Sequence, residues 1–143
     1  MCSKLESNHL QFILAGNATF TVLNPGTGCR FTFKVQKSEP SEKYPEQVWF
    51  CSLLNGPDNW TNYILFGILK DNGVKFIHSN RKGISDKAKS SVAFVWTLNR
   101  LVNNLSLNGV EIWHEGKCGR CGRKLTVPES IASGFGPECA GKL

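Results

Sequence analysis

The chain has 143 residues, of which 41% are hydrophobic and 20% charged, and its formal net charge is +6. This composition is typical of a folded protein and excludes a disordered tail, and the length allows one hydrophobic core rather than two full domains. No apolar run approaches the ~18 residues of a membrane-spanning helix, and residues 12–15 are too short for the apolar part of a secretory signal, so we expect neither a membrane nor a secreted protein.

The first half of the chain is expected to form an antiparallel meander. Apolar and polar residues alternate on both sides of the turn at 24–28, which predicts a β-hairpin. Residues 48–54 and 60–69 read as two further strands, the second with the continuous apolar centre of a central strand. The tight turn Asp71-Asn72-Gly73 then leads into a fifth strand at 74–78.

A helix is expected to follow the meander. Phe94, Leu98, Leu101 and Leu105 recur at helical spacing, and Ser85 or Asp86 is placed to cap the start of the helix. An amphipathic helix of this kind buries its apolar stripe, so we expect it to cover one face of the sheet.

The C-terminal segment carries a metal-binding pattern. Two residues separate Cys118 from Cys121, and Cys139 follows, so that three thiolates are available to one ion. Glycines after the first two cysteines permit backbone conformations in which N–H groups point at the sulfurs. A structural Zn²⁺ takes four ligands, and His114, at the end of an apparent strand at 110–113, is the expected fourth. Metal binding would supply the folding energy that this small segment lacks in hydrophobic core.

Other interpretations of the motif remain open. The fourth ligand has the alternatives His78, His9, Glu138 or a water molecule, and a water would make the site an open, catalytic one. A redox pair is the other interpretation of Cys118 and Cys121. That motif normally opens a helix after a strand, whereas glycines flank this one.

The same segment resembles a known family. It contains Cys118-Gly-Arg-Cys-Gly-Arg-Lys-Leu-Thr, then Pro128-Glu-Ser-Ile, then Gly134-Phe-Gly-Pro-Glu-Cys139, and it resembles a small zinc-knuckle domain at the C-termini of phage and prophage proteins of unassigned function. Upstream, residues 24–32, 55–59 and 113–116 look like one phage-encoded family over most of the chain. The resemblance implies that Cys118, Cys121 and Cys139 are metal ligands and that the protein works in the host cytoplasm.

The predicted fold class is therefore α+β. Residues 1–109 are expected to form an antiparallel meander sheet of about five strands covered by one long helix. Residues 110–143 are expected to form a zinc-knuckle module.

Basic residues concentrate between positions 70 and 100, a segment that contains seven Lys and Arg residues but only two Asp. Such a patch favours polyanions, nucleic acids above all. The predicted contacts lie on the loop, the helix start and the knuckle: Lys75, Arg81, Lys82, Lys87, Lys89, Arg120, Arg123 and Lys124. Exposed Trp49, Trp60 or Tyr63 would stack on bases.

The expected function is that of a phage-encoded, non-enzymatic zinc-knuckle protein that binds nucleic acid or a host nucleoprotein complex. The alternative is an anti-defence or host-takeover inhibitor that binds a host protein complex, such as a CRISPR effector, through a sheet edge or the knuckle. An enzyme is not expected, because the sequence lacks a Ser-His-Asp order, a phosphate loop, paired carboxylates and an H-E-x-x-H motif, and no small-molecule substrate is evident.

Overall fold

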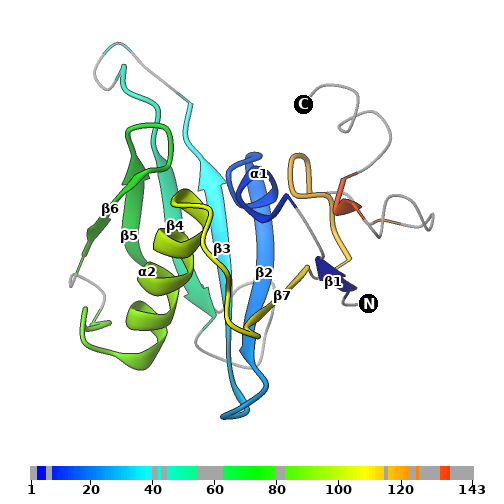
Figure 1. Cartoon of the computed structure of the whole chain (residues 1–143). Coiled ribbons are helices and arrows are strands. Elements are labelled where there is room, and N and C mark those ends of the chain that lie inside the picture. Colours follow the sequence, from blue (N-terminus) through cyan, green and yellow to red (C-terminus); the bar gives the residue numbers. More distant parts are fainter. Residues whose placement is uncertain are drawn as a thin grey trace.

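The computed structural model describes residues 3–5, 8–39, 42, 45–54, 63–79, 83–114, 116–122, 125 and 133–135. Within these residues, seven strands form one antiparallel sheet in the order β1-β7-β2-β3-β4-β5-β6 (Figure 1). The strands are β1 (Ser3–Leu5), β2 (Asn17–Asn24), β3 (Cys29–Lys37), β4 (Trp49–Leu54), β5 (Tyr63–Lys70), β6 (Lys75–His78) and β7 (Glu111–His114). Two helices accompany them in this part of the chain, α1 (His9–Ile13) and α2 (Lys89–Val102).

Strands β2 to β6 lie side by side in chain order, and left-handed residues occur in the β2–β3 and β5–β6 turns. In the β5–β6 turn, Asp71, Asn72 and Gly73 have φ values of 53°, 58° and 85°, which confirms the turn expected from the Asn-Gly pair. A Cβ at Gly73 would also lie 2.5 Å from Cδ1 of Leu14, just after α1. Glycine therefore suits this position by its backbone conformation, and a side chain here would also require Leu14 to move.

Strand β7 lies inside the sheet, between β1 and β2. His114 is opposite Phe20 of β2 on one side and Ser3 of β1 on the other. The segment that begins at residue 110 therefore includes a strand that is hydrogen-bonded within the main sheet on both sides.

The expectation of about five strands beneath one long helix is wrong: the described residues form a seven-stranded sheet and two short helices. β1 has only three residues, too few for alternation to show. The strand expected at 110–113 is present as β7, but it is part of the main sheet. Both strands join the sheet through contacts between residues far apart in the chain, which a local pattern does not reveal.

Helix α2 is shorter at both ends than the apolar pattern predicted. It ends in a Schellman motif, in which Asn104 has φ 55° and the N–H of Leu105 donates to the Arg100 carbonyl oxygen at 2.8 Å. Leu105 is consequently exposed. At the start, Ala88 is the N-cap, and the expected capping oxygen of Ser85 instead accepts the N–H of Lys87.

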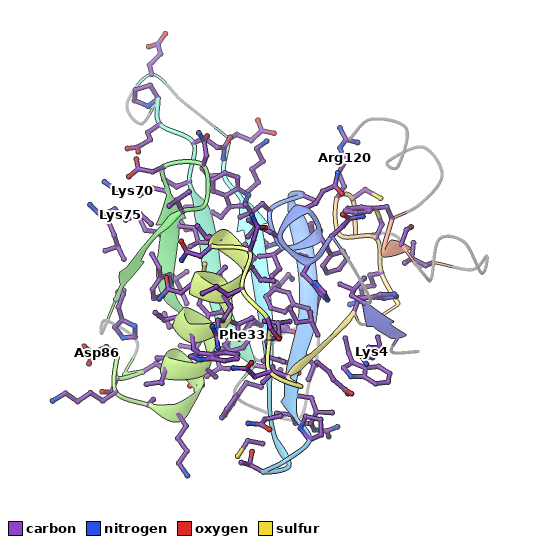
Figure 2. The ribbon with its side chains drawn as sticks, viewed as in Figure 1. Lys4, Phe33, Lys70, Lys75, Asp86 and Arg120 are labelled. Carbon is purple, nitrogen blue, oxygen red and sulfur yellow. The ribbon has the colours of Figure 1, made fainter. Side chains whose placement is uncertain are left out.

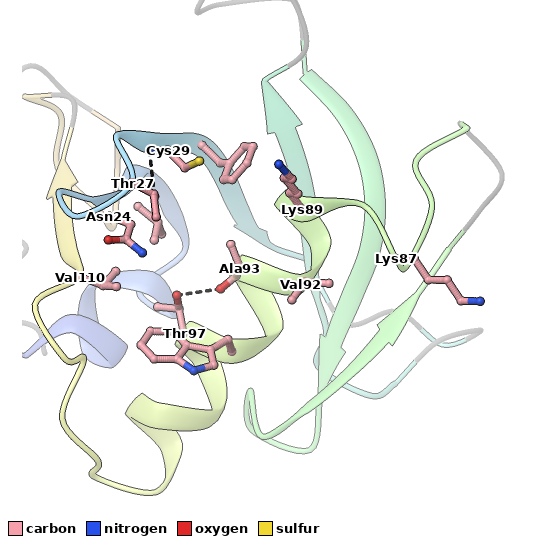
Figure 3. A pocket seen from close by; sticks show the side chains of 12 residues that line it. Asn24, Thr27, Cys29, Lys87, Lys89, Val92, Ala93, Thr97 and Val110 are labelled. Atoms are coloured by element: carbon pink, nitrogen blue, oxygen red, sulfur yellow. Dashed lines mark hydrogen bonds between the residues drawn. The ribbon is translucent and has the colours of Figure 1, made fainter.

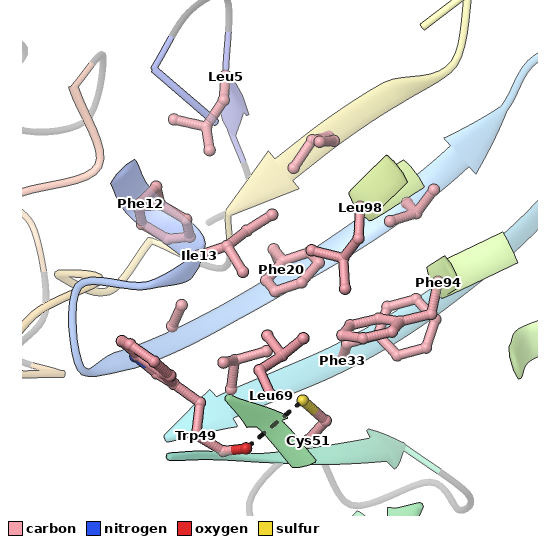
Figure 4. Packing of buried hydrophobic residues seen from close by; sticks show 14 of the residues in the cluster. Leu5, Phe12, Ile13, Phe20, Phe33, Trp49, Cys51, Leu69, Phe94 and Leu98 are labelled. Atoms are coloured by element: carbon pink, nitrogen blue, oxygen red, sulfur yellow. Dashed lines mark hydrogen bonds between the residues drawn. The ribbon is translucent and has the colours of Figure 1, made fainter. Parts of the chain in front are cut away.

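The core lies between the two helices and the sheet (Figure 4). The ring of Phe94 in α2 packs 4.9 Å from Phe33 in β3 and 5.1 Å, edge on, from Phe66 in β5. Phe66 occupies a β-bulge, because Cys51 pairs with Gly67 while the next residue of β4 pairs with Leu65. The bulge lets one extra side chain of β5 turn into the core.

Both helices cover the same face of the sheet. Phe12 of α1 lies 6.0 Å from His114, whose cross-strand partner Phe20 is in turn opposite Phe33, the residue beneath α2. Figure 1 shows the two helices in front of the sheet. We call the other side, formed by the alternate residues of each strand, the open face. Neither described helix is long and apolar enough to cross a membrane.

Candidate functional site

The first cysteine of the metal-binding pattern lies in a turn that is docked against α1 and β2. Cys118 is fully buried, and the next residue, Gly119, accepts the N–H of Asn17 at 2.8 Å and donates to the Gly134 carbonyl oxygen at 2.8 Å. A Cβ at Gly119 would lie 2.6 Å from the ring of Phe12, so a side chain there would push the turn away from α1. The turn therefore has a fixed position on the helix-covered side.

The backbone of the turn directs an N–H group at one sulfur. The N–H of Arg120 points at Sγ of Cys118 at 3.4 Å, and the N–H of Gly122, whose φ is 80°, donates to the Cys118 carbonyl oxygen at 2.9 Å. N–H groups aimed at sulfur stabilise the thiolate, the form in which cysteine binds a metal. Cys121 is exposed at the same turn. The donor set at Cys118 thus fits a metal-bound thiolate.

His114 is fully buried and holds a hydrogen bond that affects its ability to bind a metal. Its Nδ1 accepts the N–H of Gly116 at 2.9 Å, so in the neutral ring the proton is on Nε2. Binding through either nitrogen requires Gly116 to leave Nδ1, either because Nδ1 itself binds or because the proton moves there. His114 therefore remains a predicted ligand. Metal binding by His114 requires the hydrogen bond from Gly116 to Nδ1 to break first.

The complete metal site is not tested by the structure. Cys139 and Glu138 lie outside the described residues, within which no group of three or more His, Cys, Asp or Glu side chains comes together. Nε2 of His9 lies 2.8 Å from the Leu5 carbonyl oxygen. His78 is in β6, five positions from β7 in the sheet order, or ~24 Å at the usual strand spacing. His78 is therefore a poor alternative for the fourth ligand.

The four predicted basic residues that the structure describes do not form one patch. Lys75 begins β6 on the open face, Lys87 and Lys89 lie at the start of α2 on the helix-covered side, and Arg120 is in the cysteine turn. Figure 2 shows Lys75 and Arg120 toward one end of the molecule and Asp86, just before α2, toward the other. The remaining four, Arg81, Lys82, Arg123 and Lys124, lie outside the described residues.

The three aromatic candidates for base stacking have different positions. Trp49 is buried, with its indole N–H donating to the Leu14 carbonyl oxygen at 3.0 Å, so it does not stack on a ligand. Tyr63 is half-buried on the open face, with Nζ of Lys34 5.3 Å from its ring centre. Trp60 lies outside the described residues.

The open face gathers basic side chains that the sequence analysis did not select. Strand alternation and register place five there, one or two from each of four strands: Lys4, Arg30, Lys34, Lys70 and Lys75. Glu111 is the only acidic residue in the described strands, and its carboxylate lies 3.5 Å from Nζ of Lys4. Five cations against one carboxylate leave this face strongly positive.

Aromatic side chains lie among these cations on the open face. Phe50 is 42% exposed, and Trp113 is half-buried with its indole N–H donating to Oε1 of Glu111 at 3.0 Å. The signal for this face was present in β3, where Arg30, Thr32 and Lys34 form the polar half of the alternation. What the sequence did not show is that the polar side of this strand belongs to a large face with no described helix over it.

The fold and the site together define the class of protein. It has a twisted antiparallel sheet with helices on one face. The opposite face is basic and partly aromatic, and a cysteine segment follows at the C-terminal end. Residues 113–143 match a family of unknown function, DUF6011. No curated protein and no solved structure matches the chain. The match confirms a family of unassigned function for this segment, and phage origin and the zinc knuckle stay predictions.

Proposed function

We propose that the protein is a non-enzymatic nucleic-acid-binding protein whose open face contacts the phosphate backbone. The observation that carries the proposal is the composition of that face, five basic side chains with one carboxylate and with aromatic rings among them. Nucleic acids are the ligands for which such a combination is suited, because cations neutralise phosphates and rings stack on bases.

The dimensions of the open face suit an extended polyanion. Lys4 and Lys75 lie on the two edge strands, six strand positions apart, or ~29 Å at the usual spacing. Arg30 and Lys34 lie on β3 between them, and Lys70 is directly opposite Lys75. Duplex DNA carries one charge per ~1.7 Å of axis, so several phosphates span this distance.

The residues at the start of α2 contribute less in this arrangement than the sequence predicted. Lys87 and Lys89 are on the helix-covered side, so a strand lying across the open face does not reach them directly. Arg120 is exposed in the cysteine turn, away from both lysines.

The proposal includes a structural zinc ion in the C-terminal segment. Cys118, Cys121, Cys139 and His114 would hold it, and its contribution would be to fix the shape of a segment with little core of its own. The N–H of Arg120 directed at Sγ of Cys118 supports this part of the proposal.

The experiment that tests the proposal compares two double variants by fluorescence anisotropy with labelled single-stranded and duplex oligonucleotides. Arg30→Ala/Lys75→Ala removes two exposed cations from the open face, and Lys37→Ala/Lys87→Ala removes two exposed cations from elsewhere. The net charge is the same in both variants, so the comparison tests the position of the removed charges. We expect the open-face variant to bind about tenfold or more weakly and the control to bind nearly as well as the wild type. Equal losses in both, or no binding by the wild type, would overturn the proposal.

A further inference from the structure

A cavity lies on the helix-covered side of the molecule, away from the open face. It has a volume of about 360 Å³ and lies between α2 and the β2–β3 hairpin (Figure 3). Val22 and Phe31 form its base on the sheet, and Val92 and Trp96 border it from α2. The volume is within the range of ~300–1,000 Å³ found for small-molecule sites.

The walls of the cavity are mostly apolar and held in place. The Arg100 guanidinium lies 5.3 Å from the ring centre of Trp96, which gives the indole a partner outside the cavity. The Thr97 hydroxyl donates to the Ala93 carbonyl oxygen at 2.8 Å within the helix, as the dashed line in Figure 3 shows. Its hydrogen-bonding capacity as a donor is therefore used, and a ligand would meet apolar surface here.

The charge of the cavity is positive. Lys87 and Lys89 line it, and none of its described lining residues is acidic. Lys89 is the first residue of α2 and lies across from the hairpin residues Thr27 and Cys29 in Figure 3. A ligand with an apolar body would fill the space by the hydrophobic effect, and a negative group at Lys89 would gain an ion pair at the cavity mouth.

We propose that this cavity binds a small organic anion with an apolar body, a carboxylate or a chemically similar group, whose negative end contacts Lys89. The apolar part would lie between Trp96 of α2 and Phe31 of β3. The site is independent of the nucleic-acid proposal, because it is on the opposite side of the sheet and uses different residues.

The test uses octanoate as the probe and measures its binding to the full chain by isothermal titration calorimetry. Octanol and octylammonium are the uncharged and cationic controls of the same chain length. We expect octanoate to bind with a Kd on the order of 1 mM or tighter, and more tightly than either control. No measurable octanoate binding, or equal binding of all three probes, would overturn the proposal.

Two variants place the probe in this cavity. Ala93→Leu fills the space and is expected to abolish octanoate binding, with circular dichroism as the check on folding. Lys89→Met keeps a chain of similar length without charge, and is expected to weaken octanoate about tenfold while leaving octanol unchanged. Octanoate binding that survives both substitutions would place the ligand elsewhere and refute the assignment.

Discussion

The salt dependence of nucleic-acid binding is the prediction that tests the open face most quantitatively. Five cations lie on that face, and each phosphate they neutralise releases counterions from the nucleic acid. If all five make contacts, the slope of log affinity against log salt is about −4.5 on duplex DNA and about −3.5 on a single strand. Raising the salt from 50 to 200 mM then weakens duplex binding by ~500-fold.

Removal of two cations should change this slope by a calculable amount. In Arg30→Ala/Lys75→Ala three contacts remain, so the slope becomes about −2.7 on duplex DNA and the same salt step weakens binding by only ~40-fold. Fluorescence anisotropy at four or five salt concentrations measures both slopes, with Lys37→Ala/Lys87→Ala as the control that keeps the wild-type slope. A wild-type slope near zero, or a slope that the open-face variant leaves unchanged, would refute the reasoning.

Three further predictions concern the core and the cysteines. Phe94→Ala removes a buried ring packed against three others and is expected to lower the free energy of unfolding by ~3–5 kcal/mol in urea titration, and a loss below ~1 kcal/mol would contradict the packing described. Burial raises the pKa of the Cys51 thiol by disfavouring the thiolate, so at pH 8 a thiol reagent is expected to modify exposed Cys29 and spare Cys51 in the folded protein, as mass spectrometry of the labelled peptides would show. Purified protein is expected to contain one zinc ion per chain by elemental analysis, lost in Cys118→Ser and retained in Cys29→Ser, and metal-free wild type would contradict the zinc site.

The part of the fold that the sequence predicts well is the part encoded by local patterns. Alternation in β2 and β3 and the left-handed turn at Asn72-Gly73 are such patterns, and the structure has a hairpin at each place. β1 could not be found in this way, because three residues carry no usable periodicity. The sequence predicts the strand at 110–113, which is β7, but not its place between β1 and β2, because these partners are distant in the chain. The end of α2 depends on Asn104 adopting a left-handed conformation, which outweighs the apolar residue that follows it.

The candidate sites also differ in whether a local sequence pattern is enough to predict them. Spacing alone indicates the cysteine turn, since two thiolates three positions apart suit one ion wherever the turn lies. Predicting the open face requires knowing which side of the sheet the helices cover. The alternation of Arg30 and Lys34 does not show this, because it is compatible with any surface strand. The cavity depends on the small side chain of Ala93 facing a hairpin some 65 residues earlier in the chain, a distance no sequence window spans.

The place of β7 between β1 and β2 has a consequence for how the protein is made. β2 ends at Asn24 and β7 begins at Glu111, 87 residues later. At translation rates of 5–20 residues per second, β7 is synthesised about 4 to 17 s after β2. Until then one edge of β2 lacks the strand that completes its hydrogen bonding. During that interval the nascent chain presents a strand able to pair with other chains, so we expect the growing polypeptide to depend on chaperones.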